Sequence, residues 1–401
     1  MSIETRSPPL LLELRLKRAL GGAAGWSGVA VQIVFVIVLA WMAYEIVANA
    51  RTNLETQHIA AGFGFLKNTS GFDVSQHLIS YSGSDTYTRV FLVGLLNTIL
   101  VSVIGIFFAT ILGFIVALGR LSPNWLMSRI AGGYVEIVRN LPLLFQMLFW
   151  YLAVLATMPA PRQSLSPVSG VFLNNRGMIV PTPLPQSGLD YFALAVLLAM
   201  IGSFVLHRYA RRELYQRGRS IRTWPYALAL LIGLPLLTVL VFGVPVSFEW
   251  PALKGFNFVG GSRMIPEFVA LTLALTIYTA AFIAEIVRAG IMSVHKGQME
   301  AGLSLGLSRG SVLRLIVVPQ ALRVILPPLT SQYLNLTKNS SLAVAIGYPD
   351  LVSVFMGTAL SQTGQAIEII AITMGVYLLL SLVTSAIMNF YGWRLGRSMG
   401  A

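Results

Sequence analysis

Apolar runs follow one another along this chain, separated by shorter stretches that carry most of the charge. About eight runs stand out by length and composition, near residues 29–47, 89–118, 132–157, 189–206, 225–245, 266–288, 320–345 and 366–391. Each approaches or exceeds the ~20 residues that a helix needs to cross the hydrocarbon core of a bilayer. The pattern predicts an all-α, polytopic helical membrane protein with about eight transmembrane helices.

Composition removes the main alternatives to this fold class. Of the 401 residues, 56% are hydrophobic and 11% are charged, which leaves too little polar surface to enclose a soluble domain of this size. The apolar runs also lack the alternation that is typical of transmembrane β-strands. The sequence contains no cysteine, so neither disulfides nor thiolate-bound metals stabilise the fold.

The net charge of +13 raises the question of a nucleic-acid partner, and the positions of the basic residues answer it. With the N-terminus in the cytoplasm, most of the 28 Lys and Arg residues fall on the cytoplasmic side, notably in the segments 207–224 and 288–323. This asymmetry is the positive-inside pattern of membrane proteins. It predicts that both termini are cytoplasmic and that the inner face attracts anionic membrane lipids, and it argues against nucleic-acid binding.

The first apolar run, 29–47, has some features of a signal peptide. Basic residues precede it, and Ala48-Asn49-Ala50 follows it like a cleavage site. The run is nevertheless longer than the ~7–15 residues of a signal core, and the leading segment carries Glu4 and Glu13. We therefore expect an uncleaved membrane anchor.

The segment between the sixth and seventh runs, EAGLSLGLSRGSVLRLIVVP (300–319), has clear turn chemistry. Gly306 can adopt the left-handed conformation that ends a short helix, and Ser308 is a good N-cap for a second one. Pro319 interrupts the hydrogen-bond ladder near the start of the next span. The segment is predicted to form a helix, a sharp turn and a helix along the cytoplasmic side of the membrane.

Two readings of this loop follow from the residues alone. Ala301 and Gly302 leave part of the first helix without side-chain bulk, so another protein surface could approach it closely. Small residues are equally common where a connecting loop packs on its own helices. From the residues alone, the loop could be either a docking site or a simple connector.

The loop resembles the cytoplasmic EAA loop of ABC-importer permeases, whose pattern is E-A-A-x3-G-x9-I-x-L-P. The matching positions are Glu300, Ala301, Gly306, Ile316 and Pro319, while Gly302 and Val318 replace an alanine and a leucine. In that family the loop is a coupling helix that docks in a groove of the ATPase subunit. The resemblance therefore implies that 296–319 is the ATPase-coupling loop.

Other segments are similar to one branch of that family, the permeases for polar amino acids. They are GLLNTILVSVIGIFFATILGFIVALGRLS (94–122), VEIVRNLPLLFQMLFWY (135–151), YTAAFIAEIVRAGIMSVHKGQ (278–298) and LTKNSSLAVAIGYPDLV (336–352). An extended permease of this kind resembles the Q subunit of general L-amino-acid importers.

The resemblance also implies a division of the chain. A five-helix permease core would be formed by 89–157 and 266–401. The segment 1–88 would add a basic start, one further transmembrane helix and a periplasmic loop. The block 158–265 would be an insertion with two further transmembrane helices.

The resemblance implies a permease subunit of an ATP-driven importer of polar L-amino acids in a bacterial inner membrane, working by alternating access. Its partners would be an ATP-binding subunit dimer, a second and different permease chain, and a periplasmic amino-acid-binding protein. ATP and Mg²⁺ would bind the ATPase, because this chain has no G-x-x-x-x-G-K-[ST] phosphate loop. The chain itself would carry no cofactor, metal or catalytic residue.

Two rival functions remain to be weighed against this one. An ion-coupled secondary amino-acid transporter predicts an inverted repeat and broken helices around a midplane site, and the sequence shows no such repeat. An intramembrane enzyme would need clustered acids, bases or metal ligands. The four histidines are scattered over loops without zinc-helix spacing.

Polar residues at membrane depth are candidates for the substrate path, because burying them there is costly. Lys338, Asn339 and Ser340 lie late in the seventh run, which the resemblance places beside the path, and their donors could bind a substrate carboxylate. Lys338 could instead extend to the interface or pair with Glu368. Gln146 could face either the path or another helix.

Two acid–base pairs at i, i+3 spacing are predicted to be helix-surface ion pairs. They are Glu285 with Arg288 and Glu136 with Arg139. Pro142 is expected to lie in the first turn of a helix or at a kink.

Overall fold

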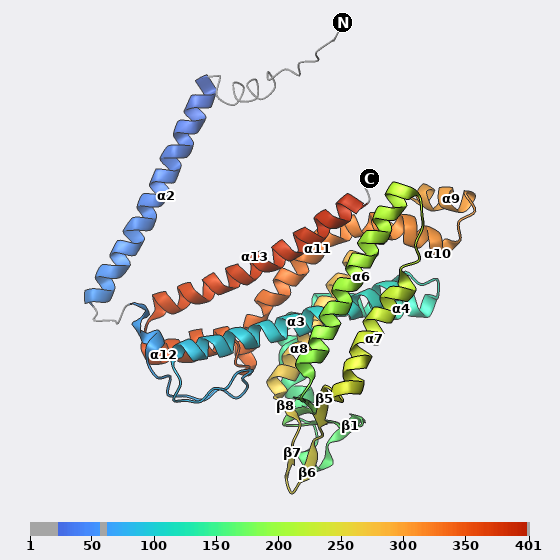
Figure 1. Ribbon diagram of the computed structural model, residues 1–401. Coiled ribbons are helices and arrows are strands. Elements are labelled where there is room, and N and C mark those ends of the chain that lie inside the picture. The colour runs from blue at the N-terminus through green and yellow to red at the C-terminus, as the bar shows by residue number, and fades with distance from the viewer. Residues whose placement is uncertain (1–22, 57–61, 399–401) are drawn as a thin grey trace.

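The computed structural model describes residues 23–56 and 62–398 (Figure 1). Among them, seven helices are long and apolar enough to cross a membrane, and an eighth span results if one bent pair is counted. The prediction of an all-α core with about eight spans is confirmed. The helices are α2 (Ala23–Thr56), α3 (Tyr87–Arg120), α4 (Trp125–Asn140), α5 (Leu143–Leu148), α6 (Leu189–Arg217), α7 (Trp224–Phe242), α8 (Pro266–Met292), α9 (Lys296–Ser304), α10 (Arg309–Val312), α11 (Val318–Asn339), α12 (Leu360–Thr363) and α13 (Ala366–Ser398).

The third predicted run is bent sharply. The helix α4 and the helical stretch Leu143–Leu155 meet at 105°. The bend falls at Leu141 and Pro142: a proline disfavours helical backbone in the residue before it, and Leu141 is extended, with φ −97° and ψ 130°. Pro142 immediately precedes α5, as expected for a kink residue.

The core of the bundle lies where α8 packs between α3 and α11. Large side chains such as Leu271 and Leu275 lie in it beside small ones, and Ala274, Ala280 and Ala284 of α8 are fully buried. A Cβ atom at Gly113 of α3 would stand 2.6 Å from Cγ2 of Ile283 on α8. Small residues of this kind let membrane helices approach closely and gain dispersion energy. The α3–α8 interface therefore depends on the absence of side-chain volume.

Three helices lie outside this core. In the apolar stretches of α2 and α7 none of the residues is buried, and in α6 11% are. The helices α6 and α7 form a hairpin in which the rings of Tyr191 and Phe242 stack with centroids 4.5 Å apart. Their other faces are apolar, which suits helices that contact lipid or another membrane protein.

The long connections around the hairpin form small antiparallel sheets, which the sequence did not predict. The sheets have the orders β1-β2-β3-β8, β4-β5 and β6-β7. The proline-rich segment 181–186 is largely β4, paired with β5. These strands have three or four residues each, too short to show a period of two. They are β1 (Leu165–Val168), β2 (Val171–Asn174), β3 (Gly177–Val180), β4 (Thr182–Pro185), β5 (Val246–Glu249), β6 (Ala252–Lys254), β7 (Asn257–Val259) and β8 (Ser262–Met264).

Candidate functional site

The predicted turn of the loop between α8 and α11 is confirmed in detail. Gly306 follows the end of α9 with φ +78°. Its N–H donates to the carbonyl of Leu303 at 2.9 Å, and the N–H of Leu307 donates to the carbonyl of Gly302 at 3.2 Å. These two bonds are a Schellman motif, which ends a helix at a left-handed residue. Glycine adopts that conformation without steric cost.

The second helix of the loop begins as the sequence predicts. The Ser308 hydroxyl accepts a hydrogen bond from the backbone N–H of Ser311 at 3.2 Å, so Ser308 is the N-cap of α10. The chain continues through a π-helical turn, Leu313–Val317, into α11. Pro319 lies in the first turn of α11. Figure 1 shows α9 and α10 projecting together at one end of the bundle.

The exposed surface of the loop combines a carboxylate with apolar side chains. Glu300 is exposed, and Leu305 at the turn is 82% exposed. Met299 and Leu303 of α9 are exposed as well. Large apolar side chains left open beside a charge are typical of a surface that another protein covers.

The two small residues of the motif have different surroundings. Ala301 is exposed, so it belongs to the open face of α9. Gly302 is buried, and a Cβ there would stand 2.9 Å from Cδ1 of Ile316 and from Cγ2 of Val312. The expectation that Gly302 leaves room for a partner is wrong, because its space is filled by the second helix of its own loop. The apolar residues that follow the turn could have indicated that this segment packs against Gly302.

The polar candidates at the end of α11 separate into exposed and buried groups. Lys338 is exposed and Asn339 is partly exposed, and both remain predicted path residues. Ser340 is fully buried, and its hydroxyl donates to the carbonyl of Thr337 at 2.8 Å. Glu368 accepts a hydrogen bond from the backbone N–H of Gly62. The suggested Lys338–Glu368 pair is not formed in the described part of the chain.

Gln146 serves the bend between α4 and α5. It is 8% exposed, and its Nε2 donates to the carbonyls of Val138 at 2.9 Å and of Leu141 at 3.0 Å. The proline at the bend leaves these carbonyls without their helical partners. Gln146 therefore caps the end of α4, and both of its N–H donors are used within the protein rather than offered to a substrate.

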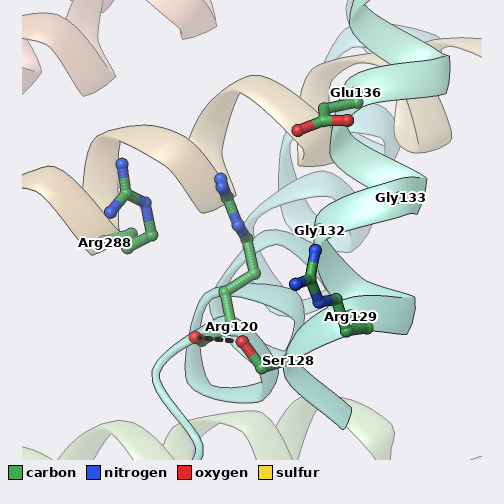
Figure 2. Close-up of a pocket in the computed structure, with 7 residues that line it drawn as sticks. All are labelled: Arg120, Ser128, Arg129, Gly132, Gly133, Glu136 and Arg288. Atoms are coloured by element: carbon green, nitrogen blue, oxygen red, sulfur yellow. Dashed lines mark hydrogen bonds between the residues drawn. The ribbon is translucent and has the colours of Figure 1, made fainter. Parts of the chain in front are cut away.

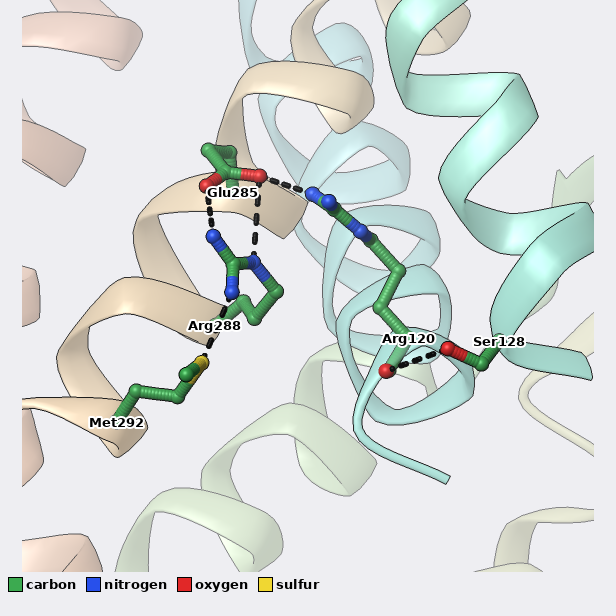
Figure 3. Close-up of polar contacts among 5 residues, drawn as sticks. All are labelled: Arg120, Ser128, Glu285, Arg288 and Met292. Carbon is green, nitrogen blue, oxygen red and sulfur yellow. Dashed lines mark hydrogen bonds and ion pairs between the residues drawn. The ribbon is translucent and has the colours of Figure 1, made fainter. Parts of the chain in front are cut away.

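An ion cluster joins α3 to the last turns of α8 (Figure 3). Nη2 of Arg288 lies 2.6 Å from Oε1 of Glu285, which confirms the predicted i, i+3 pair. Arg120, at the end of α3, pairs with the other oxygen of the same carboxylate. The sequence gives no signal for Arg120, because it is 165 residues from Glu285. The cluster lies at the end of α8 that leads directly into the α9–α10 loop.

The second predicted ion pair is wrong. The guanidinium of Arg139 lies over the ring of Phe282 on α8, 5.0 Å from the ring centroid, a cation–π contact. Its helical neighbour Glu136 is exposed and lines a cavity with three arginines, described below.

Asp350 is a buried carboxylate that sequence reasoning missed. It lies in 347–365, between two candidate spans. The N–H of Ser353 donates to Oδ1 at 2.8 Å, and the hydroxyl of Tyr377 donates to Oδ2 at 3.3 Å. Burial raises the pKa of this carboxyl to about 6. An aspartate just before the apolar run 351–359 is an N-cap signal, so this role could have been predicted.

A bundle of apolar helices with a helix–turn–helix loop at one end defines the chain as a multi-pass membrane protein. Residues 217–396 match the family described as "Binding-protein-dependent transport system inner membrane component". The chain is 53% identical over 364 residues to the putative amino-acid ABC transporter permease protein YhdX of Escherichia coli K12, covering 91% of this chain and 93% of that protein.

Two further relatives agree. The general L-amino acid transport system permease protein AapQ of Rhizobium johnstonii is 49% identical, with 91% of each chain covered. The glutamate/glutamine/aspartate/asparagine transport system permease protein BztB of Rhodobacter capsulatus is 41% identical, with 90% of this chain and 91% of that protein covered. The chain belongs to the inner-membrane permease components of ABC transporters. It is a multi-pass inner-membrane protein, and the ion-coupled alternative has no support.

Proposed function

We propose that this permease serves an ATP-driven importer of polar L-amino acids and carries them by alternating access. The observation that carries the proposal is the α9–α10 loop, with Glu300 and Leu305 exposed beside a capped turn. Such a loop can transmit a displacement of a docked subunit to α8 and α11, which it joins directly. The amino-acid substrates are suggested by the names of the relatives.

The proposed assembly contains a dimer of ATP-binding subunits, a second and different permease chain, and a periplasmic amino-acid-binding protein. ATP and Mg²⁺ bind the ATPase in this scheme, since the present sequence has no phosphate-binding loop. In this assembly the chain provides the path and the coupling surface and performs no catalysis. Copurification of an ATPase with the tagged chain tests the assembly, and purification without one contradicts it.

The proposed orientation places both termini and the coupling loop in the cytoplasm. The positive-inside pattern supports it, and in Figure 1 the end of α13 lies toward the same end of the bundle as α9 and α10. Because the sequence has no cysteine, single cysteines report topology cleanly. Cysteines in place of Tyr215 and Leu305 should be labelled from the cytoplasm, and those in place of Asn68, Asn175 and Gly255 from the periplasm. Cytoplasmic labelling at Asn175 contradicts the orientation.

The coupling role of Glu300 is tested by substitution. If its carboxylate meets a donor on the ATPase, Glu300→Ala leaves that donor unpaired and weakens docking by about 1–3 kcal/mol. ATPase retained on the purified complex and uptake into vesicles should fall together. Glu285→Ala, within α8, should lower stability while the folded fraction keeps its ATPase. Full ATPase retention and full uptake in Glu300→Ala would leave the loop as a connector only.

The turn itself is tested by a matched pair of glycines in the loop. A Cβ would meet nothing within 4 Å at either Gly306 or Gly310, but only Gly306 has a positive φ. Gly306→Val should therefore abolish uptake at normal membrane levels, because a β-branched residue strains the left-handed turn. Gly310→Val should transport far better. Equal uptake by the two variants would show that coupling does not depend on this turn.

A further inference from the structure

A cavity of about 550 Å³ opens where the ends of α3 and α8 meet α4 (Figure 2). Three arginines from three different helices line it: Arg120 of α3, Arg129 of α4 and Arg288 of α8. Figure 2 shows the Arg120 side chain extending between Arg288 and α4. Glu136 is the one acidic residue among those that line the cavity in the described structure. Glu285, behind the wall, pairs with Arg120 and Arg288, so three arginines stand against two carboxylates and one positive charge remains in excess.

Several donors in this wall have no acceptor within the protein. Arg120 uses only Nη1, toward Glu285, so its Nε and Nη2 donors stay free in the described structure. Arg288 is largely used, since it binds Glu285 and the Sδ of Met292. Arg129 forms no hydrogen bond or ion pair with any described residue. The shared Glu285 holds Arg120 and Arg288 in place, so part of the donor set is already ordered before a ligand arrives.

The α4 wall of the cavity has little side-chain bulk. Gly132 and Gly133 line it, and a Cβ at either position would meet nothing within 4 Å. An anion can therefore reach the arginines along bare helix backbone. A phosphate suits this wall best, because guanidinium groups bind its oxygens through paired, charge-assisted hydrogen bonds.

An apolar surface lies beside the cavity on the same helix. Leu126, Ile130 and Ile137 form an exposed stripe on α4, adjacent to the face that carries Arg129 and Gly133. Ile130 is 65% exposed, and Trp125, one turn before Arg129, is 70% exposed. Tryptophan is enriched at the membrane–water boundary. The ligand environment is thus cationic on one side and suited to hydrocarbon on the other.

We propose that this cavity binds the phosphate of an anionic phospholipid from the cytoplasmic leaflet, with the acyl chains along the stripe of Leu126, Ile130 and Ile137. Basic pockets between membrane helices on the cytoplasmic side have the chemistry to hold such headgroups. The proposal rests on the orientation given under the proposed function, which puts the ends of α3 and α8 at the inner leaflet. A soluble phosphate shares the headgroup chemistry but makes no use of the apolar stripe.

The test measures phospholipid retained by the full transporter complex in nanodiscs that contain phosphatidylglycerol and phosphatidylcholine, by native mass spectrometry. Arg129→Gln should lower phosphatidylglycerol retention about 10-fold, the effect of losing one strong charge-assisted contact. Gly132→Leu should lower it similarly by filling the cavity, without changing any charge. Arg219→Gln is the matched control, because Arg219 is an exposed arginine of the α6–α7 loop and should retain the lipid normally.

The outcomes separate the possible sources of phosphate. Wild-type retention of phosphatidylglycerol in both Arg129→Gln and Gly132→Leu would overturn the site. An equal loss of lipid retention in Arg219→Gln would mean that binding is only a general attraction between a basic surface and an anionic membrane. Displacement of the lipid by glycerol 3-phosphate at low concentration would assign the cavity to a soluble anion instead. Lipid retention is measured without any transport assay. Its result therefore stays valid if the proposed transport function proves wrong.

Discussion

The helices α7 and α8 have opposite surroundings although both can span a membrane. The apolar stretch of α8 is the less hydrophobic of the two, yet 56% of its residues are buried, against 0% for α7. The buried face of α8 contains Thr276, Thr279 and several alanines, whereas α7 is mainly leucine and other large apolar residues. Hydropathy therefore predicts that a helix enters the membrane, while small and weakly polar residues indicate which helix packs against protein.

The largest effect should come from filling the α3–α8 interface. Gly113→Leu puts its Cβ within 2.6 Å of Ile283, and overpacking of this kind costs about 3 kcal/mol. The matched change in the hairpin, Gly233→Leu of α7, meets nothing within 4 Å and should be close to neutral. The unfolding free energy of each variant, measured by steric trapping in mixed micelles, gives the comparison. Similar losses at both glycines would mean that α7 is as tightly packed as α8.

A smaller difference in unfolding free energy is expected between ion pairs at α8 and in the α6–α7 hairpin. Glu285→Gln leaves Arg120 and Arg288 without their shared carboxylate, and we expect a loss of about 2 kcal/mol. In the hairpin, Glu213, with only 11% of its side chain exposed, pairs at 2.9 Å with Arg217, whose side chain is 67% exposed and stays solvated when the pair is lost. Glu213→Gln should therefore cost only about 0.5 kcal/mol. The same unfolding measurement applies, and a larger loss for Glu213→Gln would contradict the expectation that a carboxylate shared by two arginines stabilises more than a single pair.

The smallest difference is expected for side chains that donate hydrogen bonds to backbone carbonyls near prolines. Gln146→Ala removes two hydrogen bonds at the α4–α5 bend and should cost about 1 kcal/mol, with normal substrate affinity if Gln146 is only a cap. Thr238→Ala removes one bond, 2.7 Å long, to the carbonyl of Pro235 in α7 and should cost about 0.5 kcal/mol. Stability and substrate-stimulated ATPase activity of the complex measure the two roles separately. A stable Gln146→Ala variant with altered substrate affinity would restore Gln146 to the path.

Sequence patterns predicted those parts of the molecule that local chemistry determines. The spans follow from the lengths of the apolar runs, and the turn at Gly306 and the cap at Ser308 follow from backbone conformations that few residues favour. Contacts between segments far apart in the sequence could not be predicted from local patterns. Arg120 meets Glu285 only because α3 and α8 cross, and Gly302 is buried only because the loop folds back on itself.

Some assignments stay predictions. The family match begins at residue 217, inside the block 158–265 that resemblance marks as an insertion, so the division into core and additions is untested. Lys338 and Asn339 keep accessible polar groups and remain candidates for the path. Ser340 and Gln146 are weaker candidates, because the protein itself occupies their donors.

The pairing of β3 with β8 has a consequence for how related chains can gain or lose an inserted segment. Val180 and Ser262 are partners in this antiparallel pair, so everything from 181 to 261 leaves and re-enters the molecule at one point. A cassette with adjacent ends can be exchanged for a tight turn without altering the route of the remaining chain. The hairpin α6–α7 can thus be acquired, lost or transplanted between related chains as one piece, while the α3–α8 crossing keeps its geometry.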